Sequence, residues 1–127
     1  QLKEGNKVLS LGNIESKRDF IDVRDVAEGL LKIGNCQLNE LSNSSIVNLG
    51  SGKTYSMREL LNFVREISKI DFTIIKDPKK LRPVDNPVLL ASLDKIKKEI
   101  EWFPKFSIKE TLREAWKDDE IPFAMKK

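Results

Sequence analysis

Apolar residues change their spacing along this chain, and the spacing predicts alternating strands and helices. Val8–Leu11 is a short apolar run that ends at Gly12-Asn13, which predicts a strand followed by a turn. Apolar positions then recur with helical spacing from Val23 to Ile33. Asp22 is placed to cap the start of this helix, and Gly34-Asn35 to cap its end.

The middle of the chain continues the alternation. A polar segment rich in Ser and Asn over residues 37–45 predicts a surface loop, and the β-branched run 45–49 predicts a strand that ends at Gly50-Ser51-Gly52. Ser56 and Glu59 have the spacing of a capping box. The helix behind this box has one apolar face, formed by Met57, Leu60, Leu61, Val64 and Ile67.

The C-terminal third predicts one strand and two helices. Residues 72–75 read as a strand, whereas 77–87 contains three prolines and predicts an extended, ordered loop. Apolar spacing at Leu93, Ile96 and Ile100 predicts a short helix that ends near Trp102. A second capping box at Ser107 and Glu110 opens the last helix. The apolar face of that helix contains Ile108, Leu112 and Trp116.

These elements together predict an α/β fold with three to four short strands and four helices. The connections between strands are long enough for helical crossovers, which favours some parallel pairing. We expect one domain over residues 1–117 and a highly charged tail over 118–127 that frays.

Composition excludes several classes of function. The 127 residues contain 23 basic and 20 acidic side chains in mixed order, so the net charge of +3 is only weak support for a nucleic-acid or membrane surface. We therefore expect neither a nucleic-acid nor a membrane partner. With no His and only Cys36, the common zinc sites and Ser-His-Asp or Cys-His catalysis are excluded, and we expect no metal site. There is no signal-peptide or transmembrane pattern, and a single cysteine fits a reducing compartment, so we expect a cytoplasmic protein.

The run Gly50-Ser51-Gly52-Lys53-Thr54 invites a nucleotide-binding interpretation, which its spacing does not support. A P-loop ending in Gly-Lys-Thr requires glycine at position 47, where this chain has Val47. A dinucleotide fingerprint requires Gly or Ala where the chain has Tyr55. We therefore interpret the run as a structural turn before a capped helix.

Arg18 and Arg82 are candidate ligands for an anion, because a guanidinium suits phosphate or carboxylate. Pro83 restricts the backbone of Arg82 to an extended conformation, which suits a binding residue. The structural alternatives are an Arg18 paired with Asp19 or Asp22 and a solvated Arg82. Spacing alone favours these alternatives.

Five segments of the chain follow one another in a familiar order. They are Leu11-Gly12-Asn13, the string from Arg18 to Val26, the string from Val47 to Lys53, the string from Leu81 to Pro87, and the stretch from Lys95 to Leu112. In this order and spacing they resemble the C-terminal half of the extended short-chain dehydrogenase/reductase family, which contains nucleotide-sugar epimerases and dehydratases. The resemblance covers residues 7 to about 116.

Within that family the strings starting at Arg18 and Leu81 are most similar to the GDP-mannose branch. This branch contains GDP-mannose 4,6-dehydratase and the reductase that acts on its product, GDP-4-keto-6-deoxymannose, and the two strings look more like the reductase. Two alternatives stay open. One is another epimerase or dehydratase acting on a UDP- or dTDP-sugar, and the other is a non-enzymatic basic interaction module, suggested by a pI near 9.0.

The resemblance implies that the chain is a substrate-binding fragment of a longer NAD(P)-dependent enzyme. The family's glycine fingerprint and its Tyr-x-x-x-Lys pair are absent here, so we expect the fragment to bind neither NADP nor NAD and to be inactive alone. Its expected partners are a GDP-sugar and a missing N-terminal Rossmann domain. Because the 45–49 strand would normally join that domain's sheet, we also expect the fragment to self-associate.

The resemblance also assigns the site residues. It places Arg18 and Arg82 on the diphosphate of the nucleotide sugar, and Gly12 and Asn13 near the nucleoside. Asp85 would lie near the ribose or orient Arg82. No catalytic residue is expected in this part of the chain.

One position departs from the family pattern at the end of the third predicted helix. The family commonly has glycine where this chain has Glu101. A left-handed helix cap there would cost a non-glycine residue some free energy.

Overall fold

The computed structural model describes residues 2–36 and 46–117, so the 37–45 loop and the 118–127 tail lie outside it. The elements are β1 (Val8–Leu11), β2 (Lys17–Asp19), α1 (Val23–Asn35), β3 (Thr54–Ser56), α2 (Met57–Ser68), β4 (Thr73–Lys76), a 3-10 helix (Pro78–Lys80), β5 (Val88–Leu89), α3 (Asp94–Ile100) and α4 (Ile108–Lys117). The α/β class and the four α-helices were both predicted, and both are confirmed.

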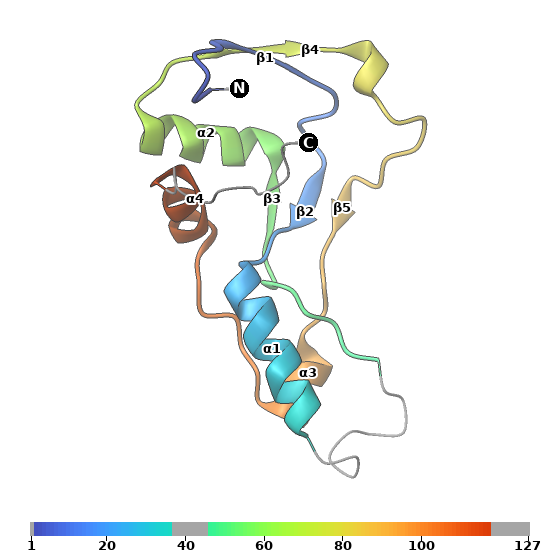
Figure 1. The fold of residues 1–127 in the computed structure, drawn as a ribbon. Coiled ribbons are helices and arrows are strands. Elements are labelled where there is room, and N and C mark those ends of the chain that lie inside the picture. The colour runs from blue at the N-terminus through green and yellow to red at the C-terminus, as the bar shows by residue number, and fades with distance from the viewer. Residues whose placement is uncertain (1, 37–45, 118–127) are drawn as a thin grey trace, which may run out of the picture.

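The strands form two small sheets. In one, β1 runs parallel to β4, and α2 packs beneath this pair (Figure 1). Leu9, Leu61 and Phe72 are buried between the helix and the sheet. The other sheet has the order β3-β2-β5, with β2 antiparallel to β3 and parallel to β5. The expected parallel pairing is therefore confirmed in both sheets.

A second core lies where α1 packs near α3, away from the β1–β4 sheet (Figure 1). Trp102, which follows α3, is completely buried, together with Leu93, Ile96 and Ile100. Val47 and Leu49 pack against this cluster, although residues 46–50 have no strand pairing within the described chain. Residues 46–49 of the expected 45–49 strand are thus unpaired in the described chain, and residue 45 lies outside it.

The sequence pattern missed three strands and misplaced one helix end. Strands β2, β3 and β5 contain only two or three residues each, which is too short for an alternating pattern to be visible. Helix α1 continues through Gly34 and Asn35 and is capped by Cys36. The proline-rich 77–87 segment begins with a 3-10 helix, because Asp77 caps it and Pro78 suits its first position.

The predicted helix starts are confirmed in detail. Asp22 accepts a hydrogen bond from the backbone N–H of Arg24 at 2.9 Å. In the capping box of α2, Ser56 Oγ accepts from the Glu59 N–H at 3.2 Å, and the Glu59 carboxylate accepts from the Ser56 N–H at 2.8 Å. The same reciprocal pair opens α4 at Ser107 and Glu110. These local bonds set where each helix begins.

Asp19 ties the end of β2 to two distant segments. Its carboxylate accepts hydrogen bonds from the backbone N–H groups of Ser51 at 2.7 Å and Gly52 at 3.0 Å. It also accepts one from the N–H of Ala91 at 3.3 Å. Amides from two parts of the chain therefore converge on one charged group.

Asp25, in the first turn of α1, also accepts hydrogen bonds from backbone amides of a distant segment. Its side chain is completely buried, and it accepts from the N–H groups of Lys105 at 2.9 Å and Phe106 at 3.1 Å. A buried carboxylate is stable only when it is hydrogen-bonded in this way. The segment leading into α4 is thus attached to α1.

Asp22 lies between these two residues and is also buried. It accepts from Arg24 Nε at 2.9 Å and Nη2 at 2.8 Å, and from Thr111 Oγ1 on α4 at 2.6 Å. The hydrogen bonds from Arg24 hold the pKa of the Asp22 carboxyl well below its ordinary value, against the opposing effect of burial.

Helix α1 leaves an apolar face open. Val23, Leu30 and Leu31 are 76%, 58% and 68% exposed, and Ala27 between them is also exposed. These positions recur at helical spacing, so they form one stripe along the helix. No helix in the described ranges is long and apolar enough to cross a membrane.

We predict that Asp22→Asn lowers the free energy of unfolding by roughly 1.5–3 kcal/mol at neutral pH, since charge-assisted bonds to Arg24 and Thr111 are lost while the cap is kept. The folded-state pKa of Asp22 is depressed, so its stabilisation is present above the unfolded-state pKa and disappears as pH falls below it. The difference between the proteins should therefore shrink below about pH 4. Urea unfolding at several pH values measures this. Asp71→Asn, at a fully exposed carboxylate, is the control and should change little.

A second prediction concerns Glu101, which does adopt the left-handed conformation, with φ 51° and ψ 36°. Glu101→Gly should raise the free energy of unfolding by about 1 kcal/mol, because glycine adopts this conformation without a steric penalty. Glu101→Ala keeps the penalty and should leave stability nearly unchanged. Equal unfolding midpoints for the Gly and Ala variants would contradict the explanation.

Candidate functional site

A hollow of about 290 Å³ brings together all five residues that the sequence singled out. Gly12, Asn13, Arg18, Arg82 and Asp85 all line it. The residues come from the turn after β1, from β2 and from the loop after the 3-10 helix, so they are separated by up to about 70 positions in the chain. The fold therefore gathers them, although nothing local in the sequence does.

Arg18 is held rigidly at this site. It is the middle residue of β2, opposite Tyr55 on β3 and Leu89 on β5. Its Nη2 pairs with the Asp85 carboxylate, and its Nη1 donates to the carbonyl oxygen of Asn86 at 2.8 Å. The interpretation of Arg18 as a partner of Asp19 or Asp22 is therefore wrong, because its ionic partner is Asp85, in the loop before β5.

Asp85 is the centre of the polar contacts. It accepts from Ser16 Oγ and from Asn13 Nδ2, each at 2.8 Å, in addition to Arg18. The hydrogen bond from Ser16, joined by those from Asn13 and Arg18, holds the pKa of the Asp85 carboxyl below its ordinary value. Asp85 thus contacts Arg18 and not Arg82, which differs from the expected contact.

Arg82 and Lys80 complete the charge of the hollow. The Arg82 side chain is exposed at the rim, and none of the described residues forms a hydrogen bond or ion pair with it. Lys80 donates to the Ser10 carbonyl oxygen at 2.7 Å. Lys80 also pairs with Asp77, with Nζ 3.9 Å from Oδ2. The hollow is thus lined by three cations and one carboxylate, Asp85, and this lining suits an anion.

Gly12 lets the turn after β1 approach the 3-10 helix. A Cβ atom at this position would lie 2.3 Å from the backbone oxygen of Lys80, so no larger residue fits without moving the backbone. Lys80 was missed in the sequence, where the only signal was a pair of lysines shortly before Arg82. The close approach that Gly12 permits is to the protein's own chain.

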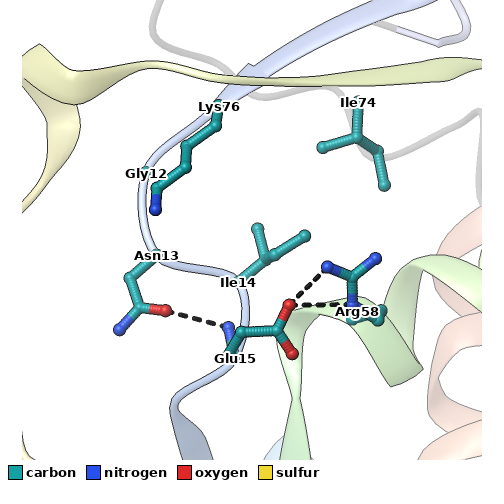
Figure 2. A pocket seen from close by; sticks show the side chains of 7 residues that line it. All are labelled: Gly12, Asn13, Ile14, Glu15, Arg58, Ile74 and Lys76. Atoms are coloured by element: carbon teal, nitrogen blue, oxygen red, sulfur yellow. Dashed lines mark hydrogen bonds and ion pairs between the residues drawn. The ribbon is translucent and has the colours of Figure 1, made fainter.

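A second hollow, of about 280 Å³, is lined by the same turn (Figure 2). It shares Gly12, Asn13 and Ile14 with the first hollow, and adds Glu15 and Arg58. Arg58, in the first turn of α2, donates from Nε to Glu15 Oε1 at 2.9 Å and from Nη2 to the same oxygen. No local pattern in the sequence indicates this pair, whose members are 43 positions apart.

The glycine turn at 50–52 is structural. The Asp19 carboxylate occupies the amides of Ser51 and Gly52 that a phosphate would need. A Cβ atom at Gly50 would lie 2.6 Å from Ala91 Cβ and 2.8 Å from Asp19 Oδ2, so close packing explains the glycine. The residues of this turn therefore do not fit the phosphates of a dinucleotide cofactor.

Comparison with known proteins identifies the family. The sequence profile described as GDP-mannose 4,6 dehydratase matches residues 1–115, which is most of the chain. The chain belongs to this family. The inferred resemblance to extended short-chain dehydrogenase/reductase enzymes that act on nucleotide sugars is thereby confirmed.

Individual members show how much of such a protein the chain represents. It is 28% identical over 122 residues to GDP-6-deoxy-D-mannose reductase from Pseudomonas aeruginosa, covering 94% of this chain and 39% of that protein. It is 35% identical over 103 residues to UDP-glucose 4-epimerase 4 from Oryza sativa subsp. japonica, covering 78% and 26%. The chain thus spans at most about two fifths of these relatives.

Solved structures agree on the fold. The structure of RMD from Pseudomonas aeruginosa complexed with NADPH superposes with a TM-score of 0.76 at 27% identity, covering 92% of this chain and 38% of that one. A UDP-glucose 4-epimerase superposes with a TM-score of 0.79 at 24% identity, covering 98% and 40%. This chain therefore has the α/β fold that its sequence predicted, and it corresponds to one part of these longer proteins.

Proposed function

We propose that this chain is the substrate-binding part of an NAD(P)-dependent enzyme that reduces or dehydrates a GDP-sugar of the GDP-mannose pathway. The observation that carries this proposal is the hollow that Arg18, Lys80 and Arg82 line from three segments of the chain. A nucleoside diphosphate carries multiple charges that such a cluster would bind. The family profile and the Pseudomonas reductase support the GDP-sugar.

The two arginines have different parts in this proposal. Arg18 is already oriented by Asp85 and by the carbonyl of Asn86, so it loses little rotational freedom when an anion binds. Arg82 has no described partner and closes on the diphosphate from the rim. Asp85 keeps the Arg18 guanidinium in place and, through its shared hydrogen bonds, remains charged beside the bound phosphates.

In this proposal, hydride transfer depends on the part of the full-length enzyme that lies outside this chain. NADP or NAD supplies the hydride when it is bound there, and this chain holds the nucleotide end of the sugar substrate. The glycine turn, whose amides are occupied by Asp19, takes no part in cofactor binding. The chain by itself is expected to be inactive.

We predict that Arg18→Ala and Arg82→Ala, each made in the full-length enzyme, raise the Kd for GDP roughly tenfold to a hundredfold, since each removes a charge-assisted contact. Arg82→Lys should recover only part of the loss, because lysine keeps the charge but not the planar fork. Titration calorimetry measures both effects. Arg113→Ala, at an exposed residue of α4, is the control. If the Arg82→Ala variant bound GDP with unchanged affinity, the assignment of Arg82 to the diphosphate site would be wrong.

A UDP-sugar is the alternative substrate, favoured by the 35% identical epimerase from rice. Titrating the same full-length protein with UDP distinguishes a GDP-sugar from a UDP-sugar substrate, because the two nucleotides share the diphosphate and differ in the base. A basic interaction module is the remaining alternative. It would require salt-sensitive binding of nucleic acid that exceeds the affinity for GDP.

The apolar stripe on α1, formed by Val23, Ala27, Leu30 and Leu31, is the surface that we assign to the remainder of the protein. When this chain is produced alone the stripe has no such cover, so we predict that the isolated chain self-associates. Sedimentation velocity over a range of concentrations measures this. The double substitution Leu30→Glu, Leu31→Glu should shift the chain toward monomer. A wild-type chain that stays strictly monomeric at high concentration would contradict this assignment.

A further inference from the structure

A third hollow, of about 220 Å³, is lined in part by the glycine turn and shares no residue with the two hollows described above. Its apolar lining consists of the rings of Phe20, Tyr55 and Phe106 together with Pro104 and Ile108. All five of these side chains are only partly buried. They come from the end of β2, from β3 and from the segment that leads into α4, so the fold brings aromatic rings from three parts of the chain to one place.

Two aspartates fix the backbone that forms this hollow. Asp19 accepts a hydrogen bond from the N–H of Ser51 at 2.7 Å, which holds the glycine turn. Asp25 accepts from the N–H groups of Lys105 at 2.9 Å and Phe106 at 3.1 Å, which holds the segment before α4. These bonds are present without a ligand. The hollow is therefore formed in advance, which lowers the cost of binding.

Most polar side chains that line the hollow already have partners. These pairs are Ser51 Oγ with Asp19 at 2.6 Å, Ser107 Oγ with Glu110 at 2.7 Å and Lys105 Nζ with Glu28 at 2.7 Å. The two other polar groups are the ammonium group of Lys53 and the hydroxyl of Tyr55. None of the residues that the structure describes forms a hydrogen bond or ion pair with either side chain. One cation and one hydroxyl are thus available to a ligand.

The charges around the hollow limit the ligand to a single negative charge. A carboxylate accepts hydrogen bonds from both an ammonium group and a hydroxyl. Three carboxylates, those of Asp19, Glu28 and Glu110, are bonded to side chains of the lining. Their negative charges would repel a dianion more strongly than a monoanion. The available groups therefore suit a monocarboxylate better than a phosphate.

We propose that the third hollow binds a small aromatic monocarboxylate, whose carboxylate accepts hydrogen bonds from Lys53 Nζ and Tyr55 Oη and whose ring packs against Phe20 and Phe106. Aromatic rings attract one another in edge-to-face and offset arrangements. The volume of about 220 Å³ is below the range of roughly 300–1,000 Å³ that is usual for drug-sized ligands, so a ligand with one ring fits. The inference does not depend on the nucleotide-sugar function, because the two sites have no residue in common.

The structural alternative is that the aromatic rings only join β2 and β3 to the start of α4, with Lys53 solvated. Phe106 does have such a structural contact, because the Arg24 guanidinium carbon lies 3.7 Å from the centroid of its ring. The two interpretations differ in what they predict for Lys53. A solvated lysine contributes to no ligand affinity, whereas a binding lysine contributes to the affinity for the charged ligand and not to that for its neutral analogue.

The test measures binding of benzoate, benzamide and phenyl phosphate to the full-length enzyme by ligand-observed nuclear magnetic resonance titration. Benzamide keeps the ring and shape of benzoate without the charge. We expect benzoate to bind more tightly than benzamide, and Lys53→Ala to weaken benzoate roughly tenfold or more while leaving benzamide unchanged. Tyr55→Phe should weaken benzoate less, because it removes one hydrogen bond and keeps the ring. Lys98→Ala, at an exposed lysine of α3 outside the three hollows, is the control and should change nothing.

Three outcomes would overturn the proposal. The first is that benzoate does not bind, or binds wild type and Lys53→Ala equally well. The second is that Arg82→Ala weakens benzoate as much as Lys53→Ala does, which would place the carboxylate in the diphosphate site. The third is that phenyl phosphate binds more tightly than benzoate in a manner that depends on Lys53, which would contradict the preference for a single charge. Loss of benzoate affinity in Lys53→Ala with full affinity in Arg82→Ala supports the proposal.

Discussion

Three aspartates at intervals of three residues hold this structure together. Asp19, Asp22 and Asp25 lie at the end of β2 and the start of α1, and each accepts hydrogen bonds from segments that are distant in the chain. Two of the three are buried, so their charge is compensated by amides, a hydroxyl and a guanidinium rather than by water. The glycine turn, the approach to α3 and the start of α4 all depend on this row of carboxylates.

The candidate site depends on the same short stretch. Arg18 directly precedes Asp19, so the bonds that fix the end of β2 also fix the backbone that carries the guanidinium. Strands on both sides of β2 further limit its movement. The loop that holds Asp85 returns beside this sheet through β5, whose Leu89 pairs with Arg18. Adjacent side chains of one strand thus have different surroundings: Asp19 bonds to the packed chain and Arg18 lines the hollow.

Charge is distributed unevenly between the two hollows. The first contains Arg18, Lys80 and Arg82 against one carboxylate, whereas the second pairs Glu15 with Arg58 and places Lys76 near them. The first hollow is therefore the more basic of the two. Asn13 lines both hollows.

The sequence by itself determined the helices, the family and the identity of five residues around one hollow. Helix starts follow from bonds that span two or three residues, as at Ser56 and Glu59, so they can be read locally. The three shortest strands could not be read, because they exist only through their pairing with distant partners. Only the tertiary structure decided that Asp85 pairs with Arg18 and that Glu15 meets Arg58. These contacts join residues 67 and 43 positions apart, and no local pattern specifies which distant charge a folded chain will bring within reach.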